Sequence, residues 1–122
     1  MDKKKILLVD DEKDLVETLT YRLEANNYVV VPAYDGQEGL DKARKDNPDL
    51  IVLDLMLPKM DGYKVCALLK RDARFGKIPI ILFTARAQDS DKRMGEEAGA
   101  DAYITKPFEP QVLLSKIEEL LA

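Results

Sequence analysis

The sequence contains no histidine in its 122 residues, which removes every mechanism that uses imidazole as a base, a nucleophile or a metal ligand. It has one cysteine, Cys66, so an internal disulfide is impossible and a reducing cytoplasm is the expected compartment. Because Cys66 falls on a predicted helix at core spacing, we expect it to be structural rather than reactive.

Long hydrophobic runs are also missing. The run from Ile6 to Val9 is stopped at once by Asp10 and Asp11, and the first five residues are not followed by a signal-peptide core. The sequence therefore predicts a cytoplasmic protein with no membrane contact.

Basic residues are in the minority, since 19 Lys and Arg stand against 23 Asp and Glu, for a net charge of −4. A mildly acidic surface is poorly suited to the phosphate backbone of nucleic acids, so we expect no direct nucleic-acid ligand. The length of 122 residues suits a single compact domain over residues 1–122.

The pattern that the sequence does contain is a regular alternation of short apolar runs with longer amphipathic stretches. The apolar runs predict strands at Ile6–Val9, Tyr28–Val31, Leu50–Leu53, Ile78–Phe83 and Ala102–Thr105. The amphipathic stretches predict helices at 15–25, Gly36–Lys45, 63–69, Asp89–Ala98 and Glu109–Leu121. The helix over Asp89–Ala98 has a sparse inner face, with little beyond Met94 and Ala98. Strands alternating with helices predict an α/β, doubly wound fold with a parallel sheet covered on both faces.

Polar residues stand where several of these strands end. Asp10 and Asp11 follow the first strand, Asp54 the third, Thr84 the fourth and Lys106 the fifth. Ligands of open parallel sheets bind outside the carboxyl ends of the strands. We therefore expect these five side chains to share one crevice.

Asp54 is the residue that most needs an explanation, because it interrupts a long apolar run in which an unpaired carboxylate would be costly to bury. Three carboxylates in one crevice would repel one another unless a cation joined them. Oxygen ligands without histidine or cysteine favour a hard ion, magnesium before zinc. Lys106 and Thr84 would add a positive charge and a hydroxyl donor for a phosphoryl group, and the nucleophile would be a carboxylate.

Each residue also has a simpler interpretation. Asp10 or Asp11 could cap the following helix, Thr84 could be a turn residue, and Lys106 could be solvated. Tyr103 is most simply a core or edge aromatic. The joint occurrence of polar residues at all five positions favours the site.

These residues resemble the receiver domain of two-component response regulators, and the resemblance extends over essentially the whole chain. It rests on the order and spacing of four motifs: Ile6–Asp11, Asp49–Asp54 with Pro58 and Asp61-Gly62, Thr84-Ala85, and Lys106-Pro107-Phe108. The resemblance implies a flavodoxin-like sheet of five strands in the order 2-1-3-4-5 with five helices. It also implies a signalling phosphoacceptor rather than an enzyme, which promotes its own phosphorylation and dephosphorylation.

The resemblance further implies that Asp54 takes a phosphoryl group from a histidine kinase, or a histidine phosphotransfer protein, as an acyl phosphate. Asp10 and Asp11 match the acidic pair that holds magnesium, with Asp11 and Asp54 as direct ligands. Met56 matches the position that contributes a backbone carbonyl to the metal.

The remaining positions concern the phosphoryl group and the response to it. Thr84 and Lys106 match the residues that contact the phosphoryl oxygens, and Pro107 matches a position where the Lys-Pro bond is cis. Tyr103 matches an aromatic switch that turns inward as Thr84 moves toward the phosphate. The change is expected to reach an output protein or domain through the face of the fourth helix, fifth strand and last helix.

That face departs from the pattern of receivers joined to winged-helix DNA-binding domains. Ala102 and Val112 occupy positions that are often acidic there, while Asp101 and Lys116 remain. The departure argues against a phosphorylation-driven dimer of that type.

Other functions fit less well. A flavin phosphate would be repelled by Asp10-Asp11-Glu12, and an aspartyl phosphatase would need a second acid where Met56 stands. A receiver-like interaction module that is never phosphorylated stays open as the alternative. The chain also ends with the last predicted helix, so a stand-alone receiver and a fragment of a larger regulator are both compatible with the sequence.

Overall fold

The computed structural model describes residues 3–85 and 89–122 of the chain. Its strands are β1 (Lys4–Val9), β2 (Tyr28–Ala33), β3 (Leu50–Asp54), β4 (Ile80–Thr84) and β5 (Ala102–Thr105). Its helices are α1 (Lys13–Ala25), α2 (Gly36–Asp46), α3 (Gly62–Arg71), α4 (Asp89–Glu97) and α5 (Pro110–Leu121). All neighbouring strands are parallel and the order is β2-β1-β3-β4-β5, which confirms the predicted fold class.

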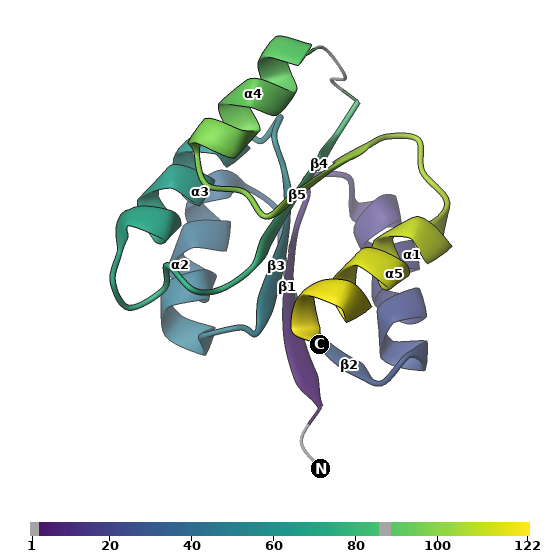
Figure 1. Ribbon diagram of the computed structural model, residues 1–122. Helices are drawn as coiled ribbons and strands as arrows, with labels where there is room; N and C mark the ends of the chain where they lie inside the picture. Colours follow the sequence, from purple (N-terminus) through teal and green to yellow (C-terminus); the bar gives the residue numbers. More distant parts are fainter. Residues whose placement is uncertain (1–2, 86–88) are drawn as a thin grey trace.

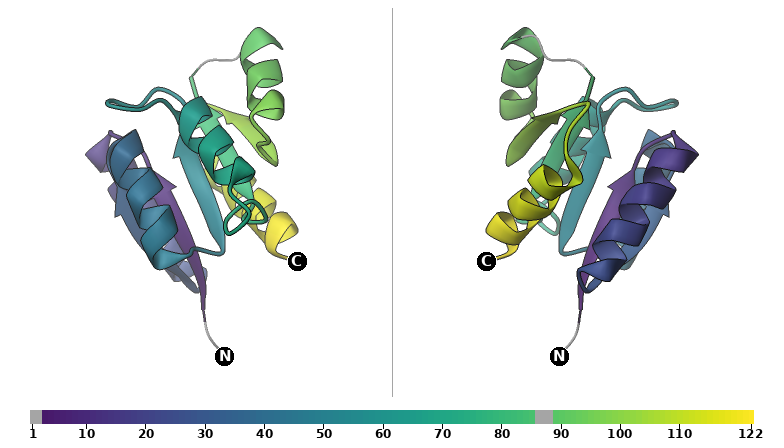
Figure 2. Two further views of the ribbon diagram at one scale, coloured as in Figure 1. Left: turned by 90° about the vertical axis from the view of Figure 1, so that its left-hand side faces the viewer. Right: turned by 90° about the vertical axis from the view of Figure 1, so that its right-hand side faces the viewer.

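The sheet separates two apolar cores, because successive side chains of a strand point to opposite faces. Helices α2, α3 and α4 lie on one side of the sheet, and α1 and α5 lie on the other (Figures 1 and 2). Alternate residues of β3 show the division: Ile51 and Leu53 pack in the first core, and Leu50 and Val52 in the second. Both cores are built mainly from Val, Leu and Ile, as in sheets that are buried on both faces.

Local signals fix the helix ends. The side chain of Asp35 accepts a hydrogen bond from the Glu38 N–H at 2.7 Å and caps α2, and Asp61 caps α3 by accepting from the Lys64 N–H at 3.0 Å. After α1, Asn27 takes a left-handed conformation with φ of 69° and turns the chain into β2.

Apart from shifts of element ends such as β1, which begins at Lys4 rather than Ile6, three predictions about these elements were wrong. Strand β2 runs two residues further than predicted, through Pro32, which is tolerated because β2 is an edge strand of the sheet. Strand β4 begins at Ile80 rather than Ile78, because Pro79 has no N–H to donate; its carbonyl still accepts from the Ile51 N–H.

The third error concerns the inner face of α4. Met94 is 48% exposed, whereas Asp91 and Gly95 are buried and Ala98 is half-buried. Residues 91, 95 and 98 share one side of the helix, and Met94 lies at the edge of that side, where its side chain is exposed. None of the described helices is long and apolar enough to cross a membrane.

Candidate functional site

Three carboxylates meet at the carboxyl ends of β1 and β3. Asp10 follows β1 directly and is fully buried, Asp54 ends β3 and is 4% exposed, and Asp11 is exposed. Each offers a carboxylate oxygen, and these oxygens lie within 4.8 Å of one another. The strands are paired with Val9 opposite Leu53, so the two buried carboxylates come together because the parallel ladder is in this register.

Lys106 brings a positive charge to the same place from the end of β5. Its Nζ lies 2.8 Å from Asp10 Oδ2 and 3.4 Å from Asp54 Oδ2. The Lys106–Pro107 peptide bond is cis, as the resemblance implied. The lysine therefore balances part of the negative charge that the sheet places here.

The electrostatics of the site reflect its burial. Burial raises the pKa of Asp10, although hydrogen bonds from Lys106 and from the Glu12 N–H oppose the shift. Burial also raises the pKa of Asp54, more than the charge of Lys106 and the hydrogen bond from the Met56 N–H lower it. For Lys106, burial lowers the pKa, but the hydrogen bond to Asp10 and the charges of Asp54, Asp10 and Glu12 outweigh it and raise the pKa.

These shifts predict how the stability of the metal-free protein depends on pH. The folded state holds the Asp54 proton more tightly than the unfolded state, so stability falls as pH rises between the ordinary carboxyl pKa and the raised one. The side-chain amide of the Asp54→Asn variant cannot titrate. The unfolding free energy of the variant minus that of the wild type should therefore grow through this window and then level off. Urea unfolding in EDTA at several pH values measures the difference, and a difference that shrank as pH rose would contradict the prediction.

The structure places the other predicted residues around this centre. Thr84 is buried at the end of β4, one residue beyond Phe83, which is paired with Asp54. The Met56 N–H donates to Asp54 Oδ1 at 3.2 Å, while its side chain is 58% exposed. Tyr103 of β5 is half-buried against the core beneath α2, α3 and α4, three residues before Lys106 in the chain.

Neither Asp10 nor Asp11 is the N-cap of α1. That position belongs to Glu12, whose side chain makes no capping hydrogen bond. Asp10 Oδ1 instead accepts from the Glu12 N–H at 2.8 Å, which fixes the carboxylate that faces Lys106. The simpler interpretation of the acidic pair as helix caps was therefore wrong.

Sequence reasoning missed two contributors to the site. The Glu12 carboxylate lies 3.5 Å from Lys106 Nζ, and the Phe83 ring centroid lies 4.7 Å from the same atom, within reach of a cation–π interaction. A signal for Glu12 was present in the sequence, because it is the third acid of the run Asp10-Asp11-Glu12. Only the parallel pairing of β4 with β5 places Phe83 near Lys106, and the linear sequence does not show it.

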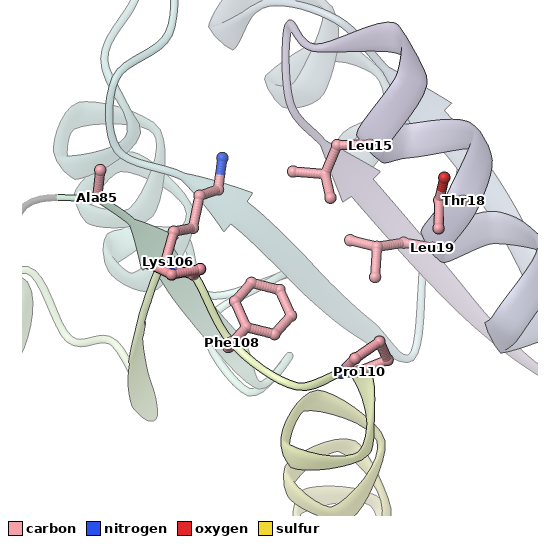
Figure 3. A pocket seen from close by; sticks show the side chains of 8 residues that line it. Leu15, Thr18, Leu19, Ala85, Lys106, Phe108 and Pro110 are labelled. Carbon is pink, nitrogen blue, oxygen red and sulfur yellow. The ribbon is translucent and has the colours of Figure 1, made fainter.

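An apolar hollow of about 420 Å³ adjoins the site on the side of α1 and α5. Figure 3 shows Leu15 and Leu19 of α1 pointing toward Phe108, with Lys106 at the edge of the hollow. Thr18 also lines it and is exposed. An apolar surface thus borders the site.

The donor set fits a hard divalent cation. The candidate side-chain ligands are carboxylate oxygens, two of them nearly buried and one open to solvent. Magnesium prefers oxygen ligands and keeps several waters, which the exposed side at Asp11 allows.

Comparison with known proteins agrees with this geometry. The family model described as the response regulator receiver domain matches residues 6–118, so the chain belongs to this family of two-component signalling proteins. It is 48% identical over 118 residues to the alkaline phosphatase synthesis transcriptional regulatory protein PhoP of Bacillus subtilis, covering 97% of this chain and 48% of that protein. It is 44% identical over 117 residues to the DNA-binding dual master transcriptional regulator RpaA of Synechocystis, covering 96% and 48%.

Solved structures lead to the same family. The chemotaxis protein CheY4 of Vibrio cholerae is 30% identical, with a TM-score of 0.91, and the match covers 98% of this chain and 99% of that one. A CheY-like receiver domain protein of Methanospirillum hungatei is 34% identical, with a TM-score of 0.92 over 98% and 94% of the two chains. The chain spans about half the length of the curated relatives above, but nearly all of these solved receivers.

Proposed function

We propose that residues 1–122 act as one receiver domain in which Asp54 is the phosphoacceptor for a histidine kinase or a histidine phosphotransfer protein. The observation that carries the proposal is the position of the Asp54 carboxylate. It is nearly buried at a strand end, 3.4 Å from Lys106 Nζ and within 4.8 Å of two further carboxylates. A nearly buried carboxylate at the carboxyl edge of the sheet, beside a lysine and two other acids, is better explained by a reaction than by a contribution to the stability of the fold.

In this reaction an Asp54 oxygen attacks the phosphorus of a phosphohistidine. The new P–O bond forms as the P–N bond of the donor breaks, and the imidazole leaves with the electron pair. Lys106 would place its ammonium beside the transferred group, and Thr84 a hydroxyl donor, so that charge on the phosphoryl oxygens is stabilised. The chain thus supplies groups for its own phosphorylation and dephosphorylation, and the transferred group stays on the chain itself.

Asp10, Asp11, Asp54 and the Met56 backbone carbonyl are the groups that would hold magnesium. When bound, the ion supplies positive charge that offsets the carboxylates and the phosphoryl oxygens. Asp10 has a further role, because its hydrogen bond of 2.8 Å to Lys106 Nζ holds the lysine at the site before the donor arrives.

The response would leave the site through Thr84 and Tyr103. Thr84 ends the strand that precedes α4, and Tyr103 lies on β5 beside α4, where its ring carbons approach Gly95. Helix α4 buries only Asp91 and Gly95 among its described side chains, so a shift of this helix costs little apolar contact. We propose that the face of α4, β5 and α5 passes the change to an output domain or protein, and that the domain itself contacts no nucleic acid.

Intact mass after incubation with acetyl phosphate and magnesium tests the acceptor. The wild type should gain one phosphoryl group, and neither the Asp54→Asn variant nor a sample in EDTA should gain it. No adduct under any condition would favour the alternative, a receiver-like interaction module that is not phosphorylated.

The apolar hollow beside Lys106 would receive the protein donor. A Thr18→Arg variant should slow transfer from any kinase that phosphorylates the wild type by roughly tenfold, the effect of losing one contact of about 1.4 kcal/mol. Transfer from acetyl phosphate should be unchanged, because Thr18 is exposed on α1 and outside the carboxylate cluster. Val29→Arg, on the exposed surface of β2, is the matched control; equal slowing by both variants would place the docking surface elsewhere.

A further inference from the structure

Two exposed methionines share a second hollow beside the site. The hollow of about 530 Å³ is lined by Leu55, Met56, Leu57, Asp61, Tyr63 and Met94. The side chain of Met56 is 58% exposed and that of Met94 is 48% exposed, although thioethers usually lie in cores. Met60 is half-buried, and Met1 lies outside the described residues.

Exposure decides which sulfur atoms of the chain an oxidant can reach. A thioether is oxidised without prior deprotonation, whereas a thiol reacts as its thiolate. Cys66 is fully buried, and burial raises its pKa to about 11. The thiol therefore does not compete with the exposed methionines.

We propose that Met56 is an oxidation site through which hydroperoxides lower the phosphoryl-acceptor activity of Asp54. The inference rests on the proposed function of Asp54. In the reaction one peroxide oxygen is transferred to the Met56 sulfur, which gives up two electrons. The O–O bond breaks, and the second oxygen leaves as water from hydrogen peroxide or as an alcohol from an organic hydroperoxide.

The connection between Met56 and the acceptor is short. Its backbone N–H donates to Asp54 Oδ1 at 3.2 Å, so its side chain starts two residues from the reacting carboxylate. Oxidation converts an apolar side chain into a polar one whose oxygen carries partial negative charge. A phosphoryl donor is itself anionic, so this oxygen opposes its approach. Met94 lines the same hollow but belongs to α4, without such a link to Asp54 among the described contacts.

The first experiment maps oxidation by peptide mass spectrometry after a titration with hydrogen peroxide. Met56 and Met94 should form sulfoxides first, Met60 more slowly, and Cys66 should stay unmodified in the folded protein. Protection of Met56 at peroxide levels that oxidise Met94 would overturn the proposal. This readout does not depend on phosphorylation.

The second experiment compares the rate of phosphorylation by acetyl phosphate before and after peroxide, as a ratio within each protein. After peroxide the rate should be about two- to fivefold lower than before it in the wild type and in Met94→Leu, the range of one solvent-exposed electrostatic contact. Peroxide should leave the rate of Met56→Leu unchanged, and methionine sulfoxide reductases should restore the rate of the oxidised wild type. A normal phosphorylation rate with fully oxidised Met56 would contradict this inference and leave the proposed function intact. The absence of a phosphoryl adduct on untreated protein would contradict the proposed function.

Discussion

Replacing Gly62 by alanine is expected to destabilise the protein by about 3 kcal/mol, at the upper end of overpacking effects. A Cβ at this position would lie 2.2 Å from the Asp54 carbonyl oxygen and 2.8 Å from Leu55 Cα. Both are backbone atoms that cannot swing aside, and the Gly62 N–H also donates to the Leu55 carbonyl at 2.9 Å. Relief would require α3 to move away from the segment that carries Asp54.

Urea unfolding measures this loss, and Gly95→Ala is the matched control. There the added Cβ would meet Leu82 Cδ1 at 3.1 Å and a Tyr103 ring carbon at 3.2 Å, which belong to side chains that can adjust. Alanine also favours the helix that contains Gly95, so the control should change stability by no more than about 1 kcal/mol. Equal losses in the two variants would show that the contact with the Asp54 backbone is not what excludes a side chain.

Magnesium is expected to stabilise the folded domain by about 2.7 kcal/mol when present at about one hundred times its dissociation constant. The unfolded chain does not hold Asp10, Asp11 and Asp54 together, so the ion binds the folded state preferentially. Chelation should reverse the gain completely. Thermal or urea unfolding across a magnesium titration, with a calcium-free buffer, gives the size of the effect.

Asp11→Asn is the discriminating variant for this site. Asp11 is exposed, so its replacement should leave the metal-free stability nearly unchanged while the magnesium-dependent gain is lost. A variant that gained as much from magnesium as the wild type would show that the ion binds outside the three-carboxylate cluster.

Much of the fold could be predicted because the strands are buried on both faces. Runs such as Leu50–Leu53 are apolar at every position, and polar residues stand where β1, β3, β4 and β5 leave the core. The site could be located for the same reason, since parallel strands bring their carboxyl ends to one edge of the sheet. Asp10, Asp54 and Lys106 were predicted to share a crevice, and they lie within hydrogen-bonding or ion-pair distance.

The rest depends on tertiary contacts that the linear pattern does not contain. Pro32 extends β2 because that strand is at the edge of the sheet, and Met94 is exposed because it lies at the edge of the buried side of α4, with Asp91 and Gly95 nearer its centre. The contact of Lys106 with Phe83 and the hollow beside it require β5 and α1 to be in their places. The roles of Asp54, Thr84 and Tyr103 stay predictions that the variants above can test.

The division of the interior into two cores has a consequence for how such a protein can diversify. The hollow beside Lys106 is built on α1 and the segment leading into α5, whereas α4 rests on the opposite core with α2 and α3. Substitutions in separate cores are far enough apart to act nearly additively. If the proposed function holds, substitutions confined to the core beneath α2, α3 and α4 could therefore alter the α4 part of the output face while the hollow that would receive the donor stays unchanged.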